Sequence, residues 1–379
     1  MNDITATSDQ RGEKARDEVA MAMDADGTPE ISSSCYPDFH RAYLDQLRIV
    51  FEKPTFFNAP RGHRSRERLA VQYQLRDPCQ RVPFAPSRRV NIVFNFAEAL
   101  WYLAGRDDLD FIEYYASNMR SYSMDSRCLT GTAYGPKIFG GPQRHRQYDT
   151  IVDLLTRDPD SKRAVIQIFD ANELRIPDNI DVSCTLGLQF FLREGRLHAV
   201  AYLRANDAYR GMVSDVFSFT MLQEFLAREL GAELGTYTHV AGTLHVYEPD
   251  NARVMAVLAD PAAAGPPPFR LPSMPRGDNR PAVASLLEIE EQLRLNRLRL
   301  PVYVDRLNLP PYWAQVALLF ETYRRIRQSE PLTADLLAAL DPAYRYFVGY
   351  RWGTEMEQRR SQLDGIPPRS LPDSRHMTT

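Results

Sequence analysis

The sequence is poor in cysteine, in long apolar runs and in net charge. Its 379 residues hold four cysteines and no CxxC pair, which disfavours a zinc site or a disulfide framework and favours a reducing cytoplasm. No stretch approaches the roughly 18 uninterrupted apolar residues that span a bilayer, and the N-terminus has no apolar signal-peptide core, so we expect neither membrane anchoring nor export. A formal net charge of −3 gives no general attraction to nucleic acids or membrane surfaces.

The composition divides the chain into four segments. Residues 1–36 contain few large apolar groups, which predicts a flexible N-terminal leader. Between residues 37 and 258 apolar positions alternate between strand and helix periods, which predicts an α+β core. Residues 259–281 are rich in proline and glycine, which predicts a linker or a loop wrapped over the surface. Residues 282–379 show helical spacing and form the expected C-terminal extension.

Hydrophobic periodicity also places individual elements. Apolar runs predict strands at 164–169, 186–192 and 197–203, and the polar turn between the last two predicts an antiparallel hairpin. Helical spacing predicts helices at residues 92–103, 216–230, 282–298, 312–328 and 332–347.

Two side chains in the core suit covalent and anion chemistry. Cys184 stands at the entry to an apolar strand, where its sulfur could face a cavity, although a buried structural cysteine fits the same pattern. Arg204 stands at a strand end, where a guanidinium can hold a phosphate with two hydrogen bonds. A solvated ion pair is the alternative for this arginine.

Taken in order, the motifs resemble those of the thymidylate synthase superfamily over residues 41–247. The resemblance covers more than half of the chain and rests on the ordered set. It implies a thymidylate synthase-like fold, in which a mixed sheet packs against helices. The motifs are Glu98-Ala99-Leu100-Trp101, Ala133-Tyr134-Gly135, the run 158–163, the Cys184 strand, the run 204–207, Gly211 with Asp215, and Leu244-His245-Val246-Tyr247.

The resemblance implies covalent catalysis on a pyrimidine nucleoside monophosphate, without a metal. Cys184 matches the nucleophile, whose thiolate adds to C6 of the base so that C5 can attack the methylene carbon of 5,10-methylenetetrahydrofolate. Glu98 matches the glutamate that organises water and relays protons around the base, with an exposed helix charge as its alternative. Tyr134 matches a position near the reacting base.

The resemblance also implies a homodimer with shared active sites, because the family builds its phosphate site across a twofold axis. Arg204 matches the arginine from the same subunit, and Lys162 and Arg163 match the pair that the partner lends. Arg61 is the first choice for a further arginine from an N-terminal loop, and Arg64 is the second. The remaining matches are Ala205 beside the phosphate arginine, His245 and Tyr247 at the sugar hydroxyls, and Asp207, Arg88 and Trp101 near the folate.

Four departures from a thymidylate synthase define the expected branch. Asp215 replaces the asparagine that pairs with uracil, and a carboxyl group can accept from the 4-amino group of cytosine while sharing a proton with N3. Thr185 replaces the histidine that follows the nucleophile. Asp215 resembles the hydroxymethylases that act on deoxycytidylate in phages or on cytidylate in mildiomycin-type nucleoside antibiotic biosynthesis. Thr185 resembles the phage hydroxymethylase. Lys162 and Ala205 resemble the cytidylate enzymes, so we expect CMP as substrate and 5-hydroxymethyl-CMP as product.

Other functions stay open at this point. Within enzymes, the alternatives are a dCMP hydroxymethylase and a methylase of dUMP or UMP, which would form dihydrofolate. Outside enzymes, the fold could serve as a nucleotide-binding or RNA-binding module without turnover. A module of that kind needs no nucleophile, so the joint presence of Cys184, Glu98 and Arg204 counts against it.

Overall fold

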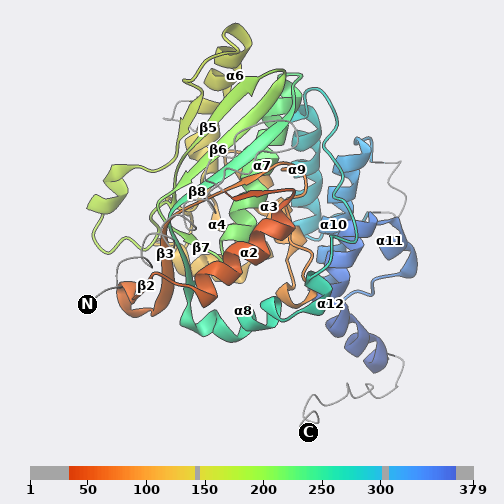
Figure 1. Cartoon of the computed structure of the whole chain (residues 1–379). Helices are drawn as coiled ribbons and strands as arrows, with labels where there is room; N and C mark the ends of the chain where they lie inside the picture. Colours follow the sequence, from red (N-terminus) through yellow and green to blue (C-terminus); the bar gives the residue numbers. More distant parts are fainter. Residues whose placement is uncertain (1–33, 141–145, 301–306, 364–379) are drawn as a thin grey trace, which may run out of the picture.

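A mixed sheet is the frame of the protein, as Figure 1 shows. The computed structural model describes residues 34–140, 146–300 and 307–363 of the chain. Among these residues the strand order is β1-β3-β8-β6-β5-β4, with β2 paired to β3 and β7 paired to β8. The strands are β1 (Ser34–Tyr36), β2 (Phe56–Asn58), β3 (Ser65–Leu75), β4 (Val165–Gln167), β5 (Thr185–Arg193), β6 (Arg196–Leu203), β7 (Asn206–Asp207) and β8 (Glu233–Tyr247).

Helices cover one face of this sheet, and the C-terminal helices lie to one side of it (Figure 1). The predicted α+β class is therefore confirmed. The helices are α2 (Phe39–Glu52), α3 (Ile92–Leu103), α4 (Leu109–Tyr115), α5 (Gly135–Phe139), α6 (Gln147–Arg157), α7 (Met212–Glu229), α8 (Asn251–Leu258), α9 (Arg280–Arg294), α10 (Pro311–Arg327), α11 (Ala334–Ala339) and α12 (Pro342–Leu363). None of the described helices is long and apolar enough to cross a membrane.

The predicted hairpin is confirmed as β5 and β6. Its strands are antiparallel, with Arg193 opposite Arg196. The two turn residues, Glu194 and Gly195, have φ angles of 50° and 71°. Positive φ at both positions matches the right-handed twist of the flanking strands, which is why two-residue hairpin turns of this kind are common. The hairpin therefore sets Cys184 before β5 next to Arg204 after β6.

Helices α3 and α7 form the layer behind the central strands. The predicted helix at 92–103 has the same bounds as α3, and Asn91 caps it by accepting a hydrogen bond from the Phe94 amide at 3.0 Å. Phe96 on α3 meets Phe217 on α7 edge to face, with ring centroids 4.9 Å apart. This contact fixes the two helices that carry Glu98 and Asp215.

The C-terminal helices belong to the same hydrophobic core as α3. Phe96 packs against Tyr344 of α12 with ring centroids 5.5 Å apart. The single helix predicted at 332–347 is wrong, because the chain forms α11 and then α12 there. Pro342 has no backbone N–H and disfavours the helical conformation of the residue before it, so it begins a new helix.

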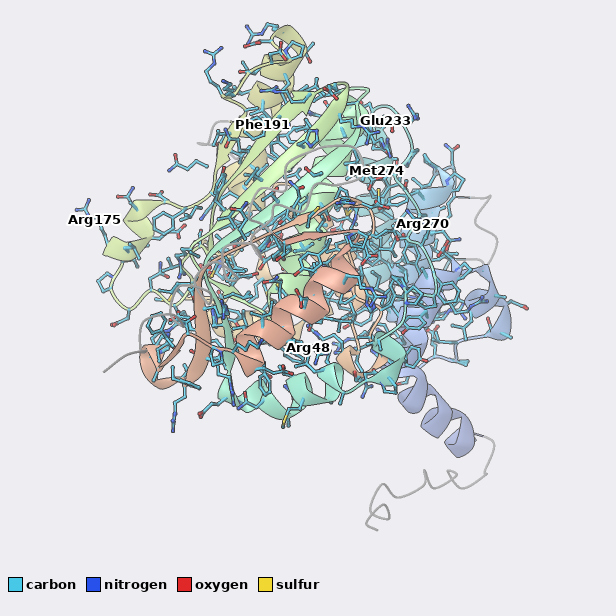
Figure 2. All side chains as sticks on the ribbon, viewed as in Figure 1. Arg48, Arg175, Phe191, Glu233, Arg270 and Met274 are labelled. Carbon is cyan, nitrogen blue, oxygen red and sulfur yellow. The ribbon has the colours of Figure 1, made fainter. Side chains whose placement is uncertain are left out.

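The Pro-rich segment 259–281 is a surface strap. Leu271 and Met274 are buried, and the Leu271 amide donates to the Gln80 side chain at 2.9 Å. Figure 2 labels Arg270 and Met274 on this strap. At the other end of the chain, residues 34–36 form β1 parallel to β3, so this end of the predicted leader is part of the sheet. The rest of the leader, residues 1–33, lies outside the described residues.

A buried carboxylate on α7, that of Glu224, binds both Arg81 and the strap. Glu224 and Arg81 are both almost fully buried, and they form a salt bridge. The Met274 amide also donates to Glu224, at 2.7 Å. Removing one partner of a buried pair leaves an uncompensated charge in the core, which is far more costly than losing an exposed pair.

We therefore expect Arg81→Met to lower the free energy of unfolding by about 3–5 kcal/mol. The matched control is Arg48→Met, which breaks the half-exposed pair Arg48–Glu52 on α2 and should cost less than about 1 kcal/mol. Urea unfolding of both variants measures the difference. Equal losses in the two variants would contradict the importance of this pair.

Candidate active site

Cys184 and Arg204 lie side by side where β5 begins and β6 ends. The Arg204 amide donates to the Cys184 carbonyl at 2.8 Å. Its guanidinium donates to the carbonyls of Ser183 at 2.8 Å and Val182 at 2.9 Å. These contacts leave one Nη2 atom 3.6 Å from the Cys184 sulfur. A cation is therefore held against a partly exposed thiol.

The pKa of the Cys184 thiol is raised above its usual value. Burial is the largest cause, the charges of Arg204 and Arg61 partly offset it, and the charge of Asp215 adds to it. A thiolate is the reactive form of cysteine, and nearby cations favour it. The two arginines therefore favour the nucleophile against the cost of desolvation.

The loop before Cys184 is tied to the loop before Tyr134. The Asp181 carboxylate accepts hydrogen bonds from the backbone amides of Thr130, Gly131 and Thr132 at 2.7–2.8 Å. A Cβ atom at Gly131 would lie 1.9 Å from the Asp181 carbonyl oxygen, so only glycine fits there. Tyr134 follows these residues, buried and stacked on Tyr102 with ring centroids 5.1 Å apart.

Two acidic side chains face the same region from α3 and α7. Burial, and then the charge of Asp215, raise the pKa of Glu98 to about 8. Burial raises the pKa of Asp215 to about 7, against a hydrogen bond from Asn206 that lowers it. The charge of Asp215 also raises the pKa of Cys184 and of Tyr134, so the four groups lie within electrostatic reach. Carboxyl groups with such pKa values can hold and release protons near neutral pH.

A cavity of about 620 Å³ opens between the N-terminal loop and the end of β8. Arg61, Arg64 and Tyr247 line it. Arg64 pairs with Glu248 at 3.3 Å, whereas Arg61 makes no ion pair within the described residues. Arg61 is thus the better placed of the two for an added anion. His245 lies two residues before Tyr247 on β8, with ring centroids 4.9 Å apart, so both reach the same side.

Lys162 and Arg163 do not reach Cys184 of their own chain. Both are exposed, and the Lys162 carbonyl accepts from the Gln189 side chain at 2.9 Å. Gln189 is five residues from Cys184 along an extended strand, a separation of about 17 Å. Any role of these two side chains at a phosphate therefore needs a second copy of the chain.

The three residues predicted near the folate have different environments. The Asp207 carboxylate accepts from the amides of Tyr209 and Arg210, both at 2.8 Å. The Arg88 guanidinium donates to the Tyr209 carbonyl at 2.7 Å and lines a second cavity of about 370 Å³. Trp101 is fully buried and lines neither cavity, so direct contact with a ligand is closed to it in this structure.

Sequence reasoning missed several residues of this region. Asn206 donates to Asp215 at 2.6 Å, and Asn95 lines the second cavity with a buried side-chain nitrogen that has no partner among the described residues. Asn206 stands inside the 204–207 run, and Asn95 precedes Glu98 by one helical turn. That spacing placed Asn95 on the same helix face as Glu98 and could have identified it. Within the described ranges, no group of three His, Cys, Asp or Glu side chains could hold a metal ion.

Comparison with known proteins identifies the family. The model of the thymidylate synthase family matches residues 41–276, which is more than half of the chain. The deoxyuridylate hydroxymethyltransferase of Bacillus phage SP01 is 32% identical over 223 residues, covering 55% of this chain and 57% of the relative. The deoxyuridylate hydroxymethyltransferase of Pseudomonas phage M6 is 34% identical over 190 residues, covering 49% and 53%. The match thus spans little more than half the length of these curated relatives. On the family match, the chain belongs to the thymidylate synthase family.

Proposed function

We propose that the protein is a folate-dependent transferase that hydroxymethylates C5 of a pyrimidine nucleoside monophosphate, with CMP as its substrate. The observation that carries the proposal is the Cys184 thiol held 3.6 Å from the Arg204 guanidinium, within electrostatic reach of two carboxyl groups with raised pKa values. The names of the phage relatives support hydroxymethyl transfer to a pyrimidine nucleotide.

In the proposed mechanism, Cys184 attacks C6 of the base and its sulfur–carbon bond makes C5 nucleophilic. Arg204 favours the thiolate and, with Arg61, holds the phosphate. When bound, methylenetetrahydrofolate would supply the one-carbon unit to C5. Loss of the C5 proton would then release tetrahydrofolate and leave a methylene group on C5. Glu98, with its pKa of about 8, relays protons to and from the base and positions the water that adds to the new C5 methylene. The C6–sulfur bond then breaks and frees Cys184.

The second cavity fits the acidic tail of a folate. Its lining residues include Arg88, Arg210 and Arg327, and guanidinium groups suit carboxylates. The buried Asn95 nitrogen, which has no hydrogen-bond partner in the described part of the chain, offers a further donor. Arg327 comes from α10, so a C-terminal helix contributes to this cavity.

Asp215 supports cytosine as the base. Near its pKa of about 7, the carboxyl group can accept from the 4-amino group and share one proton with N3. An ionised Asp215 would instead face the O4 lone pairs of uracil. The second candidate is deoxyuridylate, which the printed names of both phage relatives favour. Lys162 and Ala205 support the ribonucleotide, because they remove a forked donor and a hydroxyl from the phosphate site and leave room for a shifted sugar.

The exposed face of the sheet supports a homodimer with shared sites. Ile166 on β4 and Leu188 on β5 point into the core. The exposed large apolar side chains, 37–48% exposed, are Val165 and Leu186 on the same two strands and Tyr202 on the neighbouring β6. Large apolar side chains gathered on one face are typical of a protein interface. Figure 2 shows Arg175 at the outer end of a loop that projects from this side of the molecule.

The first test removes the proposed nucleophile. Cys184→Ser should abolish turnover of CMP with methylenetetrahydrofolate, while binding of CMP survives because phosphate contacts supply most of its affinity. Cys128→Ser is the matched control and should keep wild-type activity. Turnover and calorimetric binding measure the two effects. More than about a tenth of wild-type turnover in Cys184→Ser is incompatible with covalent catalysis.

The second test concerns the base. Asp215→Asn keeps size but replaces an acceptor with a donor, so it should swing kcat/KM from cytidine towards uridine nucleotides by about a hundredfold, since two contacts of roughly tenfold each change together. Ala205→Ser is the control and should mainly change the preference for ribose. Steady-state kinetics with CMP, dCMP, UMP and dUMP give both ratios. An equal loss on all four nucleotides would show that Asp215 does not select the base.

The third test concerns the shared site. Cys184→Ala and Arg163→Ala chains should each be inactive alone, and mixing them should restore activity through hybrid dimers in which one site has both intact residues. Fluorescence energy transfer between labelled chains shows whether subunits exchange. Absence of recovery despite complete exchange would rule out a partner-donated Arg163.

A further inference from the structure

A buried chain of side-chain hydrogen bonds leads from Tyr237 in the core to Asp215. Asn206 donates through Nδ2 to Asp215 Oδ2 at 2.6 Å. Its Oδ1 atom lies 3.0 Å from His239 Nε2, and His239 Nδ1 lies 3.0 Å from the Tyr237 hydroxyl. Asn206, His239 and Tyr237 are each at most 3% exposed.

The surroundings hold each member of this chain in place. His239 is opposite Tyr73 in the β3–β8 pairing, and the two rings stack with centroids 5.0 Å apart. Gly211 lies against the hydrogen bond between Asn206 and Asp215, since a Cβ there would come 3.3 Å from Asp215 Oδ2 and 3.6 Å from Asn206 Nδ2. The surrounding residues therefore pack closely around the hydrogen bond between the Asn206 amide and the Asp215 carboxyl group.

The protonation states of these side chains give this chain of hydrogen bonds a single donor-to-acceptor direction. Burial lowers the pKa of His239 to about 3, so its imidazole is neutral and has one donor and one acceptor nitrogen. Within the described residues, the Tyr237 hydroxyl has no partner except His239 Nδ1. A buried O–H group without an acceptor is costly, so we assign the hydroxyl as the donor in this contact. Nε2 then carries the proton and donates to Asn206 Oδ1. The amide is left with its N–H groups towards Asp215, which makes Oδ2 an acceptor.

This direction matters because a neutral carboxyl group by itself cannot tell the two bases apart. It offers one donor and one acceptor, an order that fits cytosine one way round and uracil the other. If Oδ2 is fixed as the acceptor, the carboxyl group can present its donor and acceptor to the base in only one of the two arrangements. Asp215 supplies the contact with the base, and the chain behind it decides which oxygen accepts.

We infer that Asn206 and His239 are positioning residues that lock the donor and acceptor order of the Asp215 carboxyl group and so determine which pyrimidine the site selects. This inference rests on the proposed function, since it assigns the same site its means of discrimination. Neither side chain needs to touch the nucleotide.

The test compares the ratio of kcat/KM for CMP and UMP in one preparation of each variant. The ratio does not depend on the fraction of folded protein, because both substrates report on the same folded molecules. Asn206→Ala frees the carboxyl group to exchange its donor and acceptor oxygens, so the ratio should move towards one by about tenfold, the typical net contribution of one buried hydrogen bond. His239→Leu should move it in the same direction.

Two further variants separate positioning from general packing. His239→Gln retains an amide N–H that can donate to Asn206, so it should restore the wild-type ratio relative to His239→Leu. Thr238→Val removes the hydrogen bond from Gln74 at 3.2 Å on the neighbouring position of β8 and should leave the ratio unchanged. Activity that falls in Asn206→Ala and His239→Leu equally on both nucleotides would overturn the inference.

The base preference of the wild-type protein tests the proposed function separately. If wild type favours UMP, the proposed base is wrong. The ratio for CMP over UMP is then below one, and loss of the positioning by Asn206 or His239 should raise it towards one. If neither nucleotide turns over, equilibrium binding of CMP and UMP gives the same ratio and decides the inference. An unchanged binding ratio in Asn206→Ala overturns it in that case.

Discussion

Desolvation of two acidic side chains, Glu98 and Asp215, is the constraint on which the rest of this site depends. Burial is the largest cause of both raised pKa values, about 8 and about 7. Elsewhere in the core the protein neutralises a buried carboxylate with a cation, as Arg81 does for Glu224. At the proposed site it supplies hydrogen bonds from Ser218 and Asn206 instead. These carboxyl groups therefore remain able to exchange protons near neutral pH.

The fold provides the rigidity that such a site requires. Glu98 and Asp215 stand on α3 and α7, which are joined through the ring contact of Phe96 and Phe217. The strap and the C-terminal helices pack against these same two helices through Met274 and Tyr344. The C-terminal helices lie after the family match of residues 41–276. They thus support α3 from outside that match, and α10 adds Arg327 to the second cavity.

Local patterns predicted much of this architecture, and long-range contacts account for what they missed. Periodicity gave the bounds of α3 and the β5–β6 hairpin, because both depend on neighbouring residues. It merged α11 with α12 into one helix, because the apolar pattern continues across Pro342 while the helical backbone breaks there. It gave no hint that Trp101 is fully buried. The hydrogen bond between Asn206 and His239 joins residues 33 positions apart on β7 and β8, so only the folded structure reveals it.

Product identification tests the central claim most directly. The protein is incubated with methylenetetrahydrofolate and each of CMP, dCMP, UMP and dUMP, and the nucleotides are analysed by mass spectrometry while dihydrofolate absorbance is followed. The account predicts that CMP gains one CH2O unit and that no dihydrofolate forms. A gain of CH2 with dihydrofolate, or hydroxymethylation of a uridine nucleotide in preference to CMP, would contradict it.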